Sequence, residues 1–109
     1  MKYENITILR NGLTEEEFNN EINLYKQYFK DNNIKLNDFE DIGLRKLAYR
    51  IQNNDYGHYL RFEFETNKEE ISKFEKYERK NDNVIKFLTV QLTYEEEREE
   101  NQEQDELEE

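Results

Sequence analysis

The chain has 109 residues, contains no cysteine and carries a formal net charge of −11 at pH 7. This length suits one domain with a single core, and the lack of cysteine excludes disulfide bonds and cysteine-ligated zinc. No apolar run approaches the length of a membrane span, and no secretory leader precedes the first apolar segment, so we expect a cytoplasmic protein that does not associate with membranes.

The first two predicted elements are a strand and an amphipathic helix. Residues 3–10 are rich in β-branched side chains and are followed by Asn11-Gly12, which is typical of a strand that ends in a turn. Thr14 and Glu17 have the spacing of a helix capping box. Apolar residues then recur on one helical face, at Phe18, Ile22, Tyr25 and Phe29. Residues 31–33, Asp-Asn-Asn, should end this helix.

A β-hairpin is predicted next. Residues 34–51 read as one long extended segment. Residues 53–55, Asn-Asn-Asp, and Gly57 supply the turn into a strand over residues 59–65. On that second strand, Leu60, Phe62 and Phe64 share one face.

The last two elements complete an α+β order. Asn67 begins a second predicted helix with a buried stripe of Ile71, Phe74 and Tyr77, and residues 84–92 form the final strand. This order predicts a ferredoxin-like βαββαβ sandwich, with a four-stranded antiparallel sheet and both helices on one face. The other face must be solvated or covered by a partner. Both faces of the last strand carry apolar side chains, so the open face either carries isolated exposed apolar groups, some of them under the hairpin or the tail, or is a docking surface.

The negative charge is concentrated at the end of the sequence. Residues 95–109 contain nine glutamates and Asp105 against one base, Arg98, which gives −9. The other 17 of the 27 acidic residues and 15 of the 16 basic residues leave residues 1–94 at −2. A like-charged segment without aromatic residues buries too little apolar surface to fold. We therefore predict a folded domain over residues 1–93 and an acidic disordered tail over residues 94–109, with solubility as the expected role of the tail.

One segment of the long strand carries the clearest functional signal. Residues 43–51, Gly-Leu-Arg-Lys-Leu-Ala-Tyr-Arg-Ile, place basic side chains and an aromatic inside an otherwise acidic sequence. This segment resembles the signature of the bacterial small-ribosomal-subunit protein six family, and residues 1–4, 57–60 and 82–90 are similar to that family in the same order. The resemblance covers residues 1 to about 93. It implies the same fold and a structural role in the ribosome, with small-subunit ribosomal RNA and small-subunit protein eighteen as partners.

The sequence departs from the family pattern at three positions. Asn5 and Thr7 stand where relatives are usually apolar, so either the open face of the sheet is unusually apolar or the register of the first strand differs. Arg50 stands where many relatives have proline, which adds a charge and a backbone donor near the hairpin.

The candidate RNA contacts are few. Basic side chains would neutralise phosphates, and tyrosines can stack on unpaired bases. The predicted RNA-binding residues are Lys2, Tyr3, Arg45, Lys46, Tyr49, Arg50 and Lys86. The resemblance implies Lys2, Arg45 and Lys46, whereas Arg50 and Lys86 rest on position and charge alone. Tyr49 alternates with Leu47 and Ile51, which favours a place in the core or at its rim over a stacking platform.

Little in the sequence suggests catalysis. The single histidine, His58, follows a predicted turn glycine and should be an exposed turn residue. No glycine-rich phosphate loop is present, and Arg10-Asn11-Gly12 is only a weak match to the phosphate-cradling loop of acylphosphatase-like hydrolases. We predict no enzymatic activity, no cofactor, no metal site and no small-molecule substrate. The alternative to RNA binding is an acidic protein-interaction module of the same fold, in which Arg45 and Lys46 are merely solvated.

Overall fold

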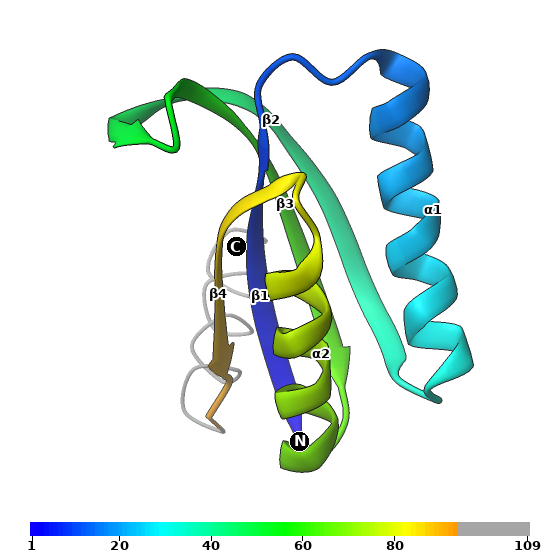
Figure 1. Ribbon diagram of the computed structural model, residues 1–109. Helices are drawn as coiled ribbons and strands as arrows, with labels where there is room; N and C mark the ends of the chain where they lie inside the picture. Colours follow the sequence, from blue (N-terminus) through cyan, green and yellow to red (C-terminus); the bar gives the residue numbers. More distant parts are fainter. Residues whose placement is uncertain (94–109) are drawn as a thin grey trace, which may run out of the picture.

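The computed structural model describes residues 1–93, so the predicted acidic tail, residues 94–109, lies outside the described residues. The elements in chain order are β1 (Lys2–Arg10), α1 (Glu15–Asp31), β2 (Lys35–Ile51), β3 (Asn54–Glu65), α2 (Lys68–Lys80) and β4 (Val84–Gln91). The strands form one antiparallel sheet in the order β2-β3-β1-β4, and both helices cover the same face (Figure 1). The predicted ferredoxin-like βαββαβ sandwich is confirmed.

The capping box predicted for α1 is present. The hydroxyl oxygen of Thr14 accepts a hydrogen bond from the backbone N–H of Glu17 at 3.1 Å, and the Glu17 carboxylate accepts one from the backbone N–H of Thr14 at 3.0 Å. These bonds satisfy donors that the first helical turn leaves without a partner. The hydrogen bonds with Thr14 lower the pKa of Glu17, so this carboxylate is ionised at neutral pH. Its negative charge interacts favourably with the positive end of the helix dipole.

Thr14→Ala should lower the free energy of unfolding by about 1 kcal/mol, because it leaves the Glu17 N–H without its side-chain acceptor. Urea denaturation followed by circular dichroism measures this loss. Ser72→Ala, at an exposed position inside α2, is the matched control and should change stability by less than about 0.5 kcal/mol. Equal denaturation midpoints for the two variants would mean that the cap contributes nothing.

Large aromatic side chains form the core between the helices and the sheet. Phe62 and Phe64 of β3, both 0% exposed, meet Tyr25 and Phe29 of α1 and Phe74 of α2. The ring centroid of Phe62 lies 4.9 Å from that of Tyr25 and 5.5 Å from that of Phe29. Such pairs combine extensive apolar burial with favourable ring geometry. A few large rings therefore hold together a chain whose hydrophobic fraction is only 34%.

β1 turns polar side chains toward this core. Asn5 and Thr7 are completely buried and hydrogen-bonded to Glu78 of α2, so they point to the helices. Ile8 points to the open face, where it forms a second, smaller buried cluster with Leu47 and Ile85. At these positions β1 is therefore polar toward the helices and apolar toward the open face.

The pairing of β4 with β1 is interrupted by a bulge. Ile8 pairs with Lys86 while Leu9 pairs with Val84, which leaves Ile85 as the extra residue. Regular alternation along this strand therefore breaks after Val84, and Ile85 reaches the open face.

The hairpin turn comes earlier than the sequence suggested. β2 runs to Ile51 and β3 begins at Asn54, so Gln52 and Asn53 form the turn, with φ values of 46° and 64°. Gly57 is not a turn residue but a member of β3, paired with Arg10 on one side and Arg45 on the other. A Cβ atom at Gly57 would collide with Ile8 and lie 3.3 Å from a δ carbon of Leu47.

β2 is the long outer strand next to β3. Its pairing with β3 shifts between Leu36 and Asp38, between Asp41 and Gly43, and between Lys46 and Ile51. These irregularities increase the local twist and bend, and they accompany the curl of the hairpin end away from the helices (Figure 1).

Candidate nucleic-acid interface

The end of the hairpin folds across the open face of the sheet. β2 and β4 occupy opposite edges, yet Lys86 of β4 donates a hydrogen bond to the Tyr49 hydroxyl of β2 at 2.9 Å. The Lys86 ammonium group also lies 5.3 Å from the centroid of the Tyr49 ring. The hydrogen bond to Tyr49 raises the pKa of Lys86, so the side chain stays protonated. The buried cluster of Ile8, Leu47 and Ile85 packs on this same face.

Four of the predicted bases gather at this hairpin end. Arg45, Lys46, Arg50 and Lys86 are all exposed. Arg45 and Lys46 point to opposite sides of β2, and neither has an ion-pair partner within residues 1–93. The Arg50 guanidinium lies 3.6 Å from the Asp55 carboxylate at an exposed position, where such a pair contributes little. These charges are available to phosphate groups.

The predicted tyrosines have opposite environments. Tyr49 is 63% exposed, so the expectation that it belongs to the core or its rim is wrong, and its ring is accessible. Leu47, two residues earlier on the same side of β2, is the one that is buried. Tyr3 is only 5% exposed and packs 6.2 Å from the Phe64 ring, between centroids. Its ring faces the helices and is not accessible for stacking on a base, so the prediction that Tyr3 contacts RNA is wrong.

Lys2 lies at the far end of β1 from the hairpin. It pairs with Glu65, whereas Arg10 at the other end of β1 pairs with Gly57. With a rise of about 3.3 Å per residue, these ends are roughly 25 Å apart. The structure thus brings Arg45, Lys46, Tyr49, Arg50 and Lys86 together and leaves Lys2 outside that group.

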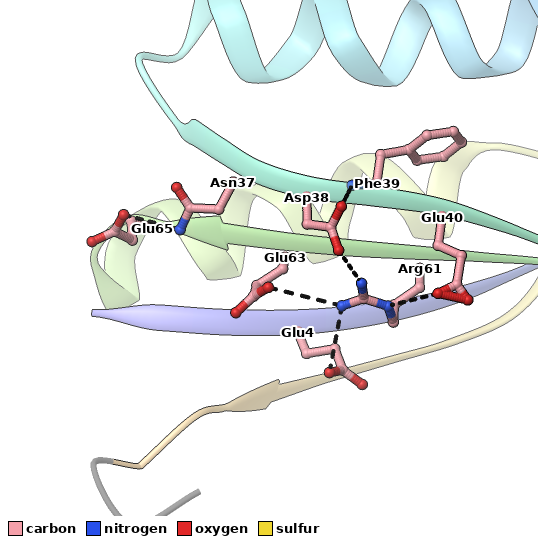
Figure 2. Close-up of polar contacts among 8 residues, drawn as sticks. All are labelled: Glu4, Asn37, Asp38, Phe39, Glu40, Arg61, Glu63 and Glu65. Atoms are coloured by element: carbon pink, nitrogen blue, oxygen red, sulfur yellow. Dashed lines mark hydrogen bonds and ion pairs between the residues drawn. The ribbon is translucent and has the colours of Figure 1, made fainter. Parts of the chain in front are cut away.

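An acidic cluster occupies the opposite end of the open face. The Arg61 guanidinium of β3 donates a hydrogen bond to Asp38 and lies 3.7 Å from Glu40, 3.8 Å from Glu4 and 3.9 Å from Glu63 (Figure 2). One base among four carboxylates leaves a net negative charge. The sequence alone does not indicate this cluster, because its members come from three strands and meet only through the sheet register. Phosphate groups are repelled here, in contrast to the basic hairpin end.

The residues considered for catalysis have structural contacts. His58 is not an exposed turn residue: it lies within β3, where its Nε2 is 2.6 Å from the Asp41 carboxylate and its ring packs 4.0 Å from that of Phe18. Arg10 donates a hydrogen bond from Nε to the Asn83 side chain at 2.8 Å. Among the residues that the structure describes, no three histidine or carboxylate side chains form a set that could hold a metal ion.

Neither helix of the described part of the chain is long and apolar enough to cross a membrane.

Comparison with known proteins places this sandwich in a class, the ferredoxin-like proteins of the small ribosomal subunit. The family model described as Ribosomal protein S6 matches residues 2–91. The chain belongs to the ribosomal protein S6 family, which confirms the resemblance seen in its sequence.

Relatives and a solved structure agree with this assignment. The small ribosomal subunit protein bS6 of Sulfurovum sp. is 40% identical over 88 residues, which cover 81% of this chain and 69% of that protein. The corresponding protein of Synechocystis sp. is 35% identical over 91 residues, or 84% of this chain and 80% of that protein. The crystal structure of 30S ribosomal protein S6 from Thermotoga maritima has a TM-score of 0.81 at 25% identity, covering 94% of this chain and 96% of that one.

Proposed function

We propose that this protein is a structural constituent of the cytoplasmic small ribosomal subunit that binds the central domain of small-subunit ribosomal RNA together with small-subunit protein eighteen. Membership of the S6 family supports the ribosomal location. The observation that supports RNA contact is the group of exposed bases, Arg45, Lys46, Arg50 and Lys86, around the accessible ring of Tyr49. The protein performs no chemistry in this role.

The hairpin residues have distinct parts in the proposed contact. Arg45 and Lys46 neutralise phosphates on the two sides of β2, which releases counterions and makes binding salt-dependent. Tyr49, held by its hydrogen bond from Lys86, offers a ring face for an unpaired base. Because the folded part of the chain is close to neutral, a second protein must supply much of the affinity for RNA.

Features of the open face support a protein partner. Leu88 and Val90 of β4 are 61% and 43% exposed, and they pair with Ile6 and with Glu4 of β1. The acidic cluster around Arg61 (Figure 2), which includes Glu4, therefore lies next to these two apolar side chains on the same face. Apolar side chains next to carboxylates suit a partner that is itself basic and partly apolar. We assign protein eighteen to this partner role on the strength of the family resemblance.

The test is a gel-shift titration of a central-domain ribosomal RNA fragment, with and without protein eighteen, at about 50 and 200 mM salt. We expect binding that requires protein eighteen and weakens with salt. Arg45→Glu/Lys46→Glu should lower the affinity by at least about tenfold and reduce the log–log salt slope by about 2, one for each lost phosphate contact.

The matched control is Lys68→Glu/Lys76→Glu, which changes the net charge equally at two exposed positions of α2. It should bind like the wild type, with circular dichroism showing that both variants are folded. Equal losses of RNA affinity in the two double variants would mean that the change in net charge causes the loss, and not the positions of Arg45 and Lys46. No binding by the folded wild type under any condition would favour the acidic protein-interaction module.

A further inference from the structure

A carboxylic acid lies in the core, away from the proposed RNA contacts. Glu78 of α2 is 0% exposed. Its Oε1 lies 2.7 Å from Nδ2 of Asn5, and its Oε2 lies 2.6 Å from the Thr7 hydroxyl and 2.9 Å from the Tyr25 hydroxyl. All three partners are neutral, and within residues 1–93 no base forms an ion pair with Glu78. An ionised carboxylate here would be buried without a counter-charge, which is strongly unfavourable.

The hydrogen-bond contacts around Glu78 require its protonated form. The Asn5 amide has two protons, one directed to Glu78 and one to the Thr89 hydroxyl at 2.9 Å. The Asn5 carbonyl oxygen lies 2.5 Å from the Thr7 hydroxyl, so the single Thr7 proton must be donated there. Thr7 then has no proton left for Glu78, although their oxygens are 2.6 Å apart. A proton on Glu78 Oε2, donated to Thr7, makes this contact a hydrogen bond.

The opposite orientation of the Asn5 amide leads to the same requirement. Turning the amide by half a rotation places its carbonyl oxygen 2.7 Å from Oε1 of Glu78. Two oxygens without protons cannot bond at this distance, so Glu78 must again supply the proton. The requirement therefore holds for both orientations of Asn5.

We propose that Glu78 is a protonated acid in the folded domain below neutral pH, and that it makes the packing of α2 against β1 a proton-dependent contact. Ionisation would leave one of the short oxygen–oxygen contacts without a proton, either that of Thr7 with Glu78 or that of Thr7 with Asn5, and would place a charge inside the core. The packing contact between the second helix and the centre of the sheet is thus sensitive to pH.

The surroundings of Glu78 agree with this assignment. Burial raises the pKa of Glu78 to about 7, although the hydrogen bonds from Thr7, Tyr25 and Asn5 lower it in part. The facing groups on β1 do not titrate, and on β4 Thr89 reaches Glu78 only through Asn5. On α1, burial raises the pKa of Tyr25 far above its ordinary value, so this hydroxyl is neutral. On α2 itself, burial likewise raises the pKa of Tyr77, and Glu75, which is paired with Arg79 at 3.7 Å, adds to the rise for Glu78.

The raised pKa of Glu78 determines how the stability of the fold changes with pH. Below the ordinary pKa of 4.5, Glu78 is protonated in both the folded and the unfolded chain, so it adds no pH dependence. Between 4.5 and about 7 only the folded state holds the proton, and the folding equilibrium constant should fall about tenfold per pH unit. Above about 7 the loss is complete, at roughly 300-fold. Glu17 and Glu65, whose pKa values are lowered, affect stability only at more acid pH, where they become protonated.

A direct test needs no variant. In the wild-type, full-length chain labelled with ¹³C, the Glu78 side-chain carboxyl resonance should titrate with a midpoint near 7, the pKa given by its environment. The other glutamates of the same sample serve as internal references, because the ordinary pKa of a glutamate is 4.5. A Glu78 midpoint among those references would overturn the proposal.

Stability measurements test the consequence for the fold. Glu78→Gln keeps the side-chain size, donates an N–H to Thr7 and cannot ionise. Urea denaturation at pH 5, 6, 7 and 8 should show the wild type losing stability relative to Glu78→Gln up to a pH of about 7 and running parallel to it above. Glu69→Gln, at an exposed position in the first turn of α2, is the matched control and should follow the wild type at every pH. Parallel curves for wild type and Glu78→Gln would contradict the proposal, and if this variant does not fold, the carboxyl titration decides.

Discussion

Phe62→Ala is expected to remove about 3–5 kcal/mol from the free energy of unfolding. Phe62 is 0% exposed at the centre of the sheet, and its ring lies 4.9 Å from Tyr25 and 5.2 Å from Phe39, between centroids. The loss combines the apolar area no longer buried with the cavity left among rings that cannot collapse into it. Since domains of this size are stable by only about 5–15 kcal/mol, the variant should be close to unfolding.

Urea denaturation monitored by circular dichroism measures this loss. The matched control is Leu88→Ala, an apolar truncation in the same sheet at a side chain that is 61% exposed, which should change stability by less than about 0.5 kcal/mol. A loss for Phe62→Ala as small as that of the control would mean that the aromatic cluster is not the main source of stability.

Gly57→Ala should cost about 1–3 kcal/mol although it adds a single methyl group. The new Cβ would collide with the γ2 methyl of Ile8 and lie 3.3 Å from a δ carbon of Leu47, in the buried cluster under the hairpin. Either the hairpin lifts away from the open face or Ile8 leaves its rotamer, and both weaken this cluster. The Tyr49 to Lys86 hydrogen bond across the face should loosen as well.

Two measurements identify the cause of that loss. Denaturation gives the change in stability, and methyl NMR should show the largest shifts at Ile8 and Leu47. Arg45→Ala, at the exposed position paired with Gly57 on β2, serves as the control and should change stability by less than about 0.5 kcal/mol. Unchanged stability with unchanged Ile8 and Leu47 resonances would show that the site has room for a side chain.

The order of elements could be predicted because local signals agreed with one another. The capping box at Thr14, the helical recurrence of Tyr25 and Phe29, and the alternation of Phe62 and Phe64 each depend on neighbours in the sequence. The predictions that were wrong concerned residues whose positions depend on contacts across the sheet. Gly57 was predicted to be a turn residue, but it lies in β3, where a larger side chain would collide with Ile8 of β1. The bulge at Ile85 reversed the side-chain alternation of β4, and no local residue type marks it.

The environments of the candidate site residues could be predicted only where they do not depend on contacts across the sheet. Arg45, Lys46, Arg50 and Lys86 were chosen by family resemblance, charge and position; all four are exposed, and their contact with RNA stays a prediction. Alternation along β2 did not show that Tyr49 is exposed, because exposure there depends on how the hairpin curls over the open face. The polar side chains of Asn5 and Thr7 were unexpected in the core, since their explanation is Glu78, more than 70 residues later in the chain.

The interrupted pairing of β2 also bears on how the protein behaves at high concentration. A long outer strand with regular spacing offers its free backbone groups to strands of other molecules, which is a route to fibrils. β2 is 17 residues long, but its pairing shifts at three points, and Gly43 at the second shift has a φ of +101°. No incoming strand could keep its hydrogen-bond spacing along the whole of this edge. The irregular strand that shapes the hairpin therefore also protects the protein against edge-to-edge aggregation before it assembles.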